Sequence, residues 1–277
     1  MTAAPVVSAE LTAMTAAPVV SAELTAMTAA LVVPAELTAA LVVPMALAVL
    51  VGAGTQRVTG LGFALVAGPL LTMVLDPVNG VRLVNLLSLT ACLIALPAVW
   101  RQADFGRALR LAVPALAVLP AGAWLAAALP SGPLLIAEGV LVIAALLVLR
   151  RSTGAPWMSG RAGAAGAGAV SGLMNVTAGL GGPAMTLYAT ATGWESRSFA
   201  ATMQVYSILI NAGSVAVKGL PQLPLPTVAL VVLCTLCGVL AGHLVSPHID
   251  HRRVRQAVLA LAAAGGLTAI AKGVITI

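Results

Sequence analysis

The chain has 277 residues, of which 60% are hydrophobic, 8% charged and 3% aromatic. Soluble domains carry about 25% charged residues, so this composition excludes a chain whose whole surface faces water and indicates a protein embedded in a lipid bilayer. The formal charge of +6 comes with two Tyr and three Phe, which are few rings for stacking on bases. Basic membrane loops therefore explain the charge better than a nucleic-acid partner.

Residues 1–40 form a low-complexity tail. The segment MTAAPVVSAELTA at 1–13 recurs at 14–26, and 27–39 repeats it with Leu31 and Pro34 as the only changes. This period matches no solenoid repeat, and the tail has none of the basic residues that begin a signal peptide. We expect a disordered tail whose removal leaves the activity of the protein intact. Translation could begin at Met1, Met14, Met27 or Met45, and the sequence leaves this open.

From residue 41 onward, charged turns divide the chain into eight apolar segments. A hydrocarbon core about 30 Å thick needs about 20 apolar residues for each spanning helix. In each half of the chain, one long segment precedes three of ordinary length. The segments are 41–75, 83–100, 108–129 and 133–149, then 162–192, 198–217, 227–247 and 254–275. We predict an all-α polytopic membrane protein with a first transmembrane repeat at 41–149, a cytoplasmic basic linker at 150–161 and a second repeat at 162–277.

The two long segments share a motif, which indicates internal duplication. Residues 58–62 have the sequence Val-Thr-Gly-Leu-Gly and residues 176–182 have Val-Thr-Ala-Gly-Leu-Gly-Gly, and a proline follows each, Pro69 and Pro183. Both segments are too long for one upright helix, and Gly lowers helix stability by about 1 kcal/mol relative to Ala. Each long segment is therefore predicted to be a broken helix or a helical hairpin, with its non-helical backbone beside protein or a wet cavity.

Arginines cluster in three connections, at 101–110, 150–161 and 252–255. The positive-inside rule places all three in the cytoplasm. They share one side only if segment 162–192 crosses the membrane twice or is re-entrant, and the sequence leaves these two possibilities open. Each half then has an odd number of crossings, so the halves are inverted and both termini face outside. Inverted repeats with discontinuous helices are a secondary-transporter design.

Several stretches resemble one known family. They are Gly54–Pro69, Ser171–Pro183 with Leu187-Tyr188 after it, and Arg197–Gln204 ahead of Asn211. These are similar to the motifs of the TauE/SafE family, the sulfite exporter or toluene-sulfonate-uptake-type permeases, and the resemblance covers about 41–277. Met174-Asn175 departs from the small residues more usual there. The resemblance implies a multi-pass transporter of sulfur-containing anions in a bacterial inner membrane. Substrate, direction and coupling ion stay open.

The two predicted helix breaks are the candidate anion site. A broken helix exposes backbone N–H groups and a partial positive charge at the N-terminus of its second half, so two such ends bind an anion without a buried cation. Arg57 lies in an apolar stretch, where an ionisable residue costs at least about 2.5 kcal/mol, and is the strongest candidate for anion attraction. The alternative is that glycines and polar residues only pack helices. The candidate substrate-binding residues are Gln56, Arg57, Thr59, Gly60, Gly62, Asn175, Thr177, Gly179, Gly181, Gly182, Gln204 and Asn211.

Glu138 is the only acid within a predicted spanning helix, so it is the candidate for proton coupling, with an interfacial, water-exposed position as the alternative. Arg82 and Arg197 occupy corresponding turns and are expected to anchor them.

Cys234 and Cys237 have the spacing of half a redox or metal site, but no second pair accompanies them. We therefore expect no metal, no cofactor and no enzymatic activity. A membrane redox or metal-dependent enzyme that uses these cysteines, and a non-transporting assembly factor, are the alternatives. The expected partners are a small anionic substrate and the lipid bilayer, and homo-oligomer formation stays open.

Overall fold

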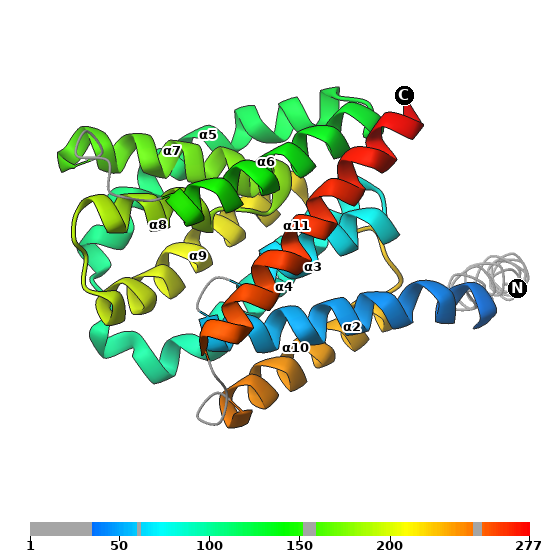
Figure 1. The fold of residues 1–277 in the computed structure, drawn as a ribbon, viewed down its shortest axis with the longest axis horizontal. Helices are drawn as coiled ribbons and strands as arrows, with labels where there is room; N and C mark the ends of the chain where they lie inside the picture. The colour runs from blue at the N-terminus through cyan, green and yellow to red at the C-terminus, as the bar shows by residue number, and fades with distance from the viewer. Residues whose placement is uncertain (1–34, 60–61, 152–158, 246–250) are drawn as a thin grey trace, which may run out of the picture.

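The computed structural model describes residues 35–59, 62–151, 159–245 and 251–277, and these residues are helical with no strand among them (Figure 1). The first half holds α2 (Ala35–Thr59), α3 (Gly62–Val74), α4 (Pro77–Val99), the 3-10 helix η1 (Trp100–Gln102), α5 (Phe105–Ala128) and α6 (Ser131–Arg151). The second holds α7 (Gly160–Ala178), α8 (Gly182–Ala191), α9 (Ser196–Lys218), α10 (Leu225–Val245) and α11 (His251–Thr276).

The eight predicted apolar segments correspond to these helices. Within the described part of the chain, six helices are long and apolar enough to cross a membrane, namely α4, α5, α6, α9, α10 and α11. This confirms an all-α polytopic membrane protein. Residues 1–34 of the predicted tail lie outside the described residues, and α2 begins at Ala35, inside the predicted 1–40 boundary.

Each long segment is a helical hairpin: α3 turns back along α2, and α8 turns back beside α7 (Figure 1). At 1.5 Å per residue, α3 is about 20 Å long and α8 about 15 Å. Both are shorter than a hydrocarbon core of about 30 Å. We infer that the two hairpins are re-entrant, and that each enters and leaves at the same end of the bundle.

The second hairpin turns at Gly179 for a steric reason. Gly179 has φ of +72°, and its N–H donates to Asn175 O at 2.8 Å, while Leu180 N donates to Met174 O at 3.2 Å. A Cβ at Gly179 would lie 2.8 Å from Val84 Cγ1. The position therefore requires glycine, because other L-residues are strained at this φ and have no room here. Pro183 follows in the first turn of α8, where its missing N–H is not needed.

The helix ends that flank the three predicted basic connections lie at one end of the bundle, here named the basic end (Figure 1). The C-terminus and the start of α2 lie at the opposite end, here named the far end, and α4 and α9 run in opposite directions. Helix packing keeps the same pattern when the halves are exchanged: α5 packs on α7 as α10 packs on α2, and α4 pairs with α9 as α6 pairs with α11. Internal duplication, which stays a prediction, would produce this pattern.

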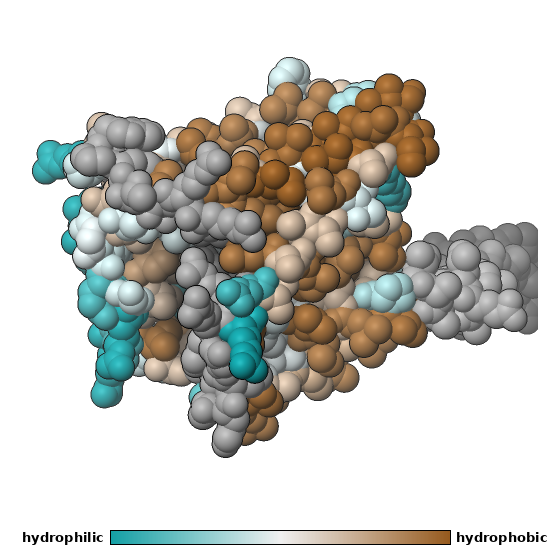
Figure 2. Space-filling view, viewed as in Figure 1, coloured by the Kyte–Doolittle hydropathy of each residue, from teal (hydrophilic) through white to brown (hydrophobic). Residues whose placement is uncertain are grey.

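The outer faces of the helices are apolar, as a lipid-facing surface requires. Figure 2 shows apolar side chains over the helix faces. Much of the hydrophilic surface in this view lies toward the basic end. Leu109, Trp124 and Leu240 are among the large apolar residues exposed on these faces. Inside, α6 and α11 approach closely through glycines, since a Cβ at Gly139 would lie 2.5 Å from Gly266 O. Small residues serve this purpose in membrane bundles.

Candidate functional site

A small cavity of about 70 Å³ lies where the two hairpins meet α4 and α9. Its walls combine side-chain amides, hydroxyls and glycines with a few apolar groups. The lining residues are Gln56, Phe63, Ala64, Ser88, Cys92, Asn175, Gly179, Gly181, Gly182, Met203, Gln204, Tyr206, Ser207, Ile210 and Asn211. This central cavity contains no Lys, Arg, Asp or Glu among its described lining residues.

The N-terminal ends of both short helices border the central cavity. Phe63 and Ala64 belong to the first turn of α3, and Gly181 and Gly182 are the N-cap and first residue of α8. The first turn of a helix carries N–H groups without helical partners and about half a positive charge. A Cβ at Gly181 would lie 3.0 Å from both Ile210 Cδ1 and Ser171 Oγ, so this approach needs a small residue.

Buried hydrogen bonds fix the turn of the second hairpin. Ser171 Oγ donates to Gly181 O at 2.6 Å, and Tyr206 Oη donates to Ser171 Oγ at 2.8 Å. Tyr206 is fully buried. Because buried polar groups are costly to leave unpaired, this chain holds the start of α8 in place against α9.

Asn175 fixes the same hairpin from its other side. Its Nδ2 donates to Asn211 Oδ1 at 3.2 Å and to Ser214 Oγ at 3.0 Å, and all three side chains are buried. Asn175 and Asn211 were both predicted as polar lining, and the structure places them in one hydrogen-bonded group with Ser214, which the sequence did not indicate.

The structure brings seven of the twelve predicted site residues to the central cavity: Gln56, Asn175, Gly179, Gly181, Gly182, Gln204 and Asn211. Thr177 is not among them, and its hydroxyl donates to Leu173 O within α7 at 2.7 Å. Gly62 begins α3, and Arg57 and Thr59 lie in the last turn of α2, but their surroundings, like Gly60 itself, lie outside the described residues.

Sequence reasoning missed Ser88, Cys92, Tyr206 and Ser207, yet a signal for three of these four was present. A constant offset of 119 positions pairs residues of the two halves, and at least one member of each pair lines the central cavity. An internal duplication predicts such an offset. The pairs are Gln56 with Asn175, Gly62 with Gly181, Asn85 with Gln204, Ser88 with Ser207, and Cys92 with Asn211.

A second cavity of about 160 Å³, here named the vestibule, adjoins the first. Gln56 and Gln204 line both cavities, and from them the vestibule extends to the exposed residues Gln102 and Arg197 at the basic end. The remaining lining residues are Ala53, Ala91, Ala95, Val99, Ala200, Ala201 and Val239. The vestibule therefore extends from the two glutamines of the central cavity toward the basic end.

The two glutamines at the junction have unused hydrogen-bonding capacity. Gln56 Oε1 and Gln204 Oε1 are buried and have no partner among the described residues, and Gln56 Nε2 makes only a 3.8 Å contact with Cys92 Sγ. A side-chain amide presents either its oxygen or its NH₂ to a cavity after a half-turn. These groups are therefore able to bind water or a passing solute.

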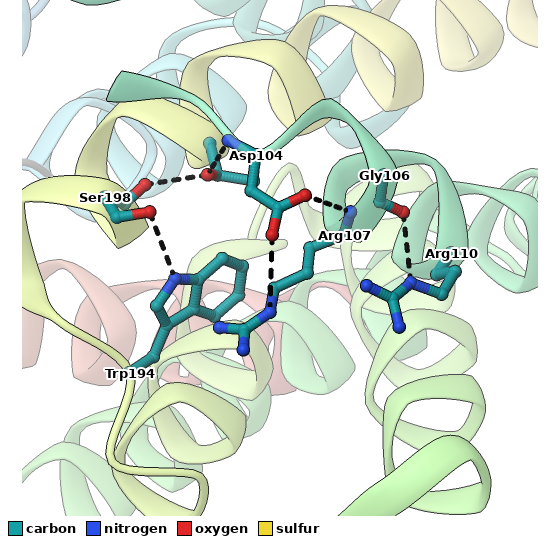
Figure 3. A network of polar contacts seen from close by, with 7 residues as sticks. Asp104, Gly106, Arg107, Arg110, Trp194 and Ser198 are labelled. Carbon is teal, nitrogen blue, oxygen red and sulfur yellow. Dashed lines mark hydrogen bonds and ion pairs between the residues drawn. The ribbon is translucent and has the colours of Figure 1, made fainter. Parts of the chain in front are cut away.

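A polar network lies close in the chain to Gln102 and Arg197, which line the vestibule (Figure 3). Asp104 N donates to Thr202 Oγ1 at 2.9 Å, Arg107 Nε lies 3.5 Å from Asp104 Oδ2, and the Arg107 guanidinium lies 4.7 Å from the ring centre of Trp194. Trp194 Nε1 donates to Ser198 Oγ at 3.4 Å. The network joins the start of α5 to the start of α9, where Arg197 lies.

Glu195 is the N-cap of α9. Its carboxylate accepts hydrogen bonds from Ser198 N at 2.6 Å and Arg197 N at 2.9 Å, and these bonds hold the pKa of Glu195 below its ordinary value. The cap fixes the helix end that carries Arg197.

Glu138 is buried on α6 and does not line the central cavity. It faces Thr72 of α3 and Lys218 of α9, and its Oε1 has no hydrogen-bond partner among the described residues. Lys218 is also buried, and its Nζ donates to Val176 O in the last turn of α7 at 2.8 Å. The water-exposed alternative for Glu138 is therefore wrong.

Cys234 and Cys237 lie on α10, half-buried and exposed respectively. In the described part of the chain, no three His, Cys, Asp or Glu side chains gather closely enough to hold a metal ion. His243 is exposed at the end of α10, and His248 lies outside the described residues.

The family model described as "Sulfite exporter TauE/SafE" matches residues 45–269, which is most of the chain. No curated protein matches the chain, and no solved structure does.

Proposed function

The chain belongs to the TauE/SafE sulfite exporter family, and on this premise we propose that it transports a small sulfur-containing anion, sulfite or a sulfonate, bound in the central cavity. Membership makes it a multi-pass membrane transporter and not an enzyme. The observation that carries the proposed site is that the N-terminal ends of α3 and α8 border one cavity.

The chemistry of this cavity suits an anion. Two helix N-termini supply N–H groups and partial positive charge, and Ser88 and Ser207 add hydroxyl donors. No carboxylate lines the described wall to repel a negative charge. A space of about 70 Å³ takes a few water-sized groups, so in this state it suits an ion of few atoms better than an aryl sulfonate.

The first break completes the proposed site. Arg57 and Thr59 lie in the last turn of α2, directly after Gln56, which lines the cavity, and Gly62 begins α3. With Gly60 they are the residues that we propose for this half of the site. We keep Arg57 as the residue that attracts the anion, because a cation this deep in an apolar segment requires a function or a partner.

We assign coupling to protons through Glu138. Thr72 and Lys218 are the buried polar and charged groups that face it, and the exposed carboxylate of Asp76 lies close enough to act on its charge. Lys218 holds the last turn of α7, and a change in the protonation of Glu138 therefore acts on the second hairpin through Lys218. Glu138→Gln should leave anion binding in place while removing the dependence of flux on a pH gradient.

The basic end faces the cytoplasm of a bacterial inner membrane in this proposal, since its connections carry the arginine clusters. The redox-enzyme alternative has no support from the family, which is one of transporters.

Thermal unfolding of the purified protein in the presence of sulfite, thiosulfate, sulfoacetate and aryl sulfonates tests the substrate class. A ligand that binds only the folded state raises its stability by about 2.7 kcal/mol at a hundredfold excess over Kd. Sulfite is expected to raise the melting temperature, and chloride at equal ionic strength to leave it unchanged. If no sulfur anion raises it, the proposed substrate class is wrong.

A further inference from the structure

Another cavity, of about 670 Å³, lies at the basic end, between the first two turns of α5, the first two turns of α7 and the last turn of α8. It shares no described lining residue with the central cavity or the vestibule. Three arginines line it, and its described walls contain no Asp or Glu. We name it the arginine cavity, and its walls include Arg107, Arg110, Arg161, Leu111, Ala164 and Tyr188.

The two arginines of α5 keep their terminal nitrogens available. Arg107 uses Nε for its 3.5 Å contact with Asp104 Oδ2, and its guanidinium lies over the ring of Trp194 (Figure 3). Arg110 uses Nε for a hydrogen bond to Gly106 O at 3.2 Å. The terminal NH₂ groups of both side chains have no hydrogen-bond partner among the described residues. Such a pair of NH₂ groups is the fork that binds two oxygens of a phosphate or a carboxylate.

The third arginine lies at a helix end that disfavours a cation. Arg161 is the second residue of α7, and the first turn of α7 contains no acidic residue. A helix N-terminus carries about half a positive charge, so it disfavours a cation and favours an anion. Gly160 begins the helix with φ of +83°, and a Cβ at this position would meet no atom within 4 Å. The space beside this helix end is therefore open.

Three permanent positive charges and one positive helix end thus face a single cavity. In the described part of the chain, Arg107 is the one of the three arginines with a carboxylate beside it, that of Asp104. Arginine remains protonated at physiological pH, so the cavity cannot relieve the repulsion by losing a proton. An anion bound among the three side chains would relieve it. The planar guanidinium fork favours an oxyanion such as phosphate.

The helix surface beside the arginine cavity is apolar. Leu109 and Val113, which neighbour Arg110 on α5, are each more than half exposed, as side chains that face acyl chains are. Within the cavity, Leu111 and Ala164 are buried apolar lining residues. The cavity therefore lies where the lipid-facing surface meets the charged basic end. This is the depth at which phospholipid headgroups lie in a bilayer.

We propose that the arginine cavity binds the phosphate of an anionic phospholipid from the leaflet at the basic end. Arg110 and Arg161 are its principal contacts, and Tyr188 of α8 supplies a hydroxyl donor. Basic pockets between membrane helices are suited to such headgroups. Because α7 and α8 are the two arms of the second hairpin, a lipid in this cavity joins both arms to α5 and stabilises the hairpin from its basic end.

Native mass spectrometry of the purified full chain, released from a neutral detergent, counts bound lipids and tests the proposal. Phosphatidylglycerol is titrated into the protein, phosphatidylcholine is the control with no net charge, and glycerol 3-phosphate is the soluble source of the same phosphate chemistry. Phosphatidylglycerol is expected to bind at least about tenfold more tightly than either. Equally tight binding of phosphatidylcholine would show that no anionic headgroup is recognised. Equally tight binding of glycerol 3-phosphate would show a site for a soluble ligand, and either result overturns the proposal.

Charge-matched variants locate the binding. Arg110→Gln and Arg161→Gln should each weaken phosphatidylglycerol binding about fivefold, which corresponds to about 1 kcal/mol for one basic residue at an anionic surface. Arg101→Gln removes the same charge from an exposed position outside the cavity and should hardly change the binding. Arg110→Lys keeps the charge and should recover most of the affinity. An equal loss with Arg101→Gln, or no recovery with Arg110→Lys, would contradict a lipid site in this cavity.

The double variant Arg110→Gln/Arg161→Gln links occupancy of the cavity to stability. Both side chains are exposed, so without lipid the variant should unfold at the same temperature as the native chain. Phosphatidylglycerol should raise the melting temperature of the native chain, because it binds the folded state, and leave that of the double variant unchanged. An equal rise in both would place the lipid elsewhere. Neither measurement uses sulfite, so the outcome is independent of the substrate proposed above.

Discussion

The two hairpins occupy matching places in the bundle but are held differently. The second is fixed to α9 by Tyr206 and by the bonds of Asn175, and Lys218 caps its last turn. In the first, Gln56 makes one long contact with Cys92 and leaves its oxygen unpaired beside two cavities. The second hairpin is therefore held in place by buried hydrogen bonds. In the first hairpin, the side-chain amide of Gln56 stays available to a solute.

Among the changes considered, Gly179→Ala should lower the stability of the protein most, because it disturbs the turn of the second hairpin. It places a Cβ 2.8 Å from Val84 Cγ1 and forces a left-handed conformation, which alone costs about 1–2 kcal/mol. We expect a melting temperature lower by several degrees, measured by thermal unfolding in detergent. Gly193→Ala has a similar φ of +59° with open space around it, and should cost less. Equal losses for both variants would show that the turn at Gly179 is not tightly packed.

Asn175→Ala and Gln56→Ala form the matched pair. Asn175→Ala removes two buried hydrogen bonds and leaves Asn211 and Ser214 unpaired, for a loss of about 2–3 kcal/mol in unfolding free energy. Gln56→Ala removes one weak contact, so stability should hardly change while sulfite affinity falls. Titration calorimetry and thermal unfolding of both variants measure the two effects. The same pattern of losses in both would mean that the hairpins are equivalent.

Arg197→Gln should act on entry rather than on the bound state. The residue lies at the exposed rim of the vestibule, and its charge raises the local concentration of anions. We expect KM for flux from the basic end to rise about threefold at low salt, with kcat nearly constant. Arg197→Lys keeps the charge and should restore KM. A fall in kcat alone would place Arg197 elsewhere in the cycle.

The smallest effect concerns Glu195. Its pKa is lowered by the Ser198 and Arg197 N–H groups, so its cap contributes stability above the ordinary pKa of Glu and loses it as pH falls through the lowered value. Glu195→Gln should therefore flatten the acid side of the stability profile, measured by melting temperature against pH. An unchanged profile would show that the cap is energetically silent.

Hydropathy and charge predicted the eight segments, both helix breaks and the common end of the arginine clusters, because these depend on local composition. The amides Gln56, Asn175, Gln204 and Asn211 were found through their motifs. Ser171 and Tyr206 gave no local signal, since a single hydroxyl in an apolar helix becomes informative only when its partner on another helix is known. Lys218 gave no local signal for the same reason, because its partner Val176 lies on another helix.

Thr177 was predicted as a site residue from an alignment of the two motifs that pairs it with Thr59. Pairing Thr59 with Thr177 requires one inserted residue between the two motifs, whereas the uninterrupted offset pairs Thr59 with Ala178. Thr177 accordingly bonds within its own helix and does not line the cavity.

The measurement that tests the central claim most directly is flux of radiolabelled sulfite into proteoliposomes, with the cavity open or filled. Ser207→Leu fills the central cavity, and Leu233→Phe on the exposed face of α10 is the control. The proposed site predicts saturable flux for the native chain and for Leu233→Phe, and flux no greater than that of empty liposomes for Ser207→Leu. Undiminished flux through Ser207→Leu, while the variant remains folded by thermal unfolding, would contradict a site at the two helix breaks.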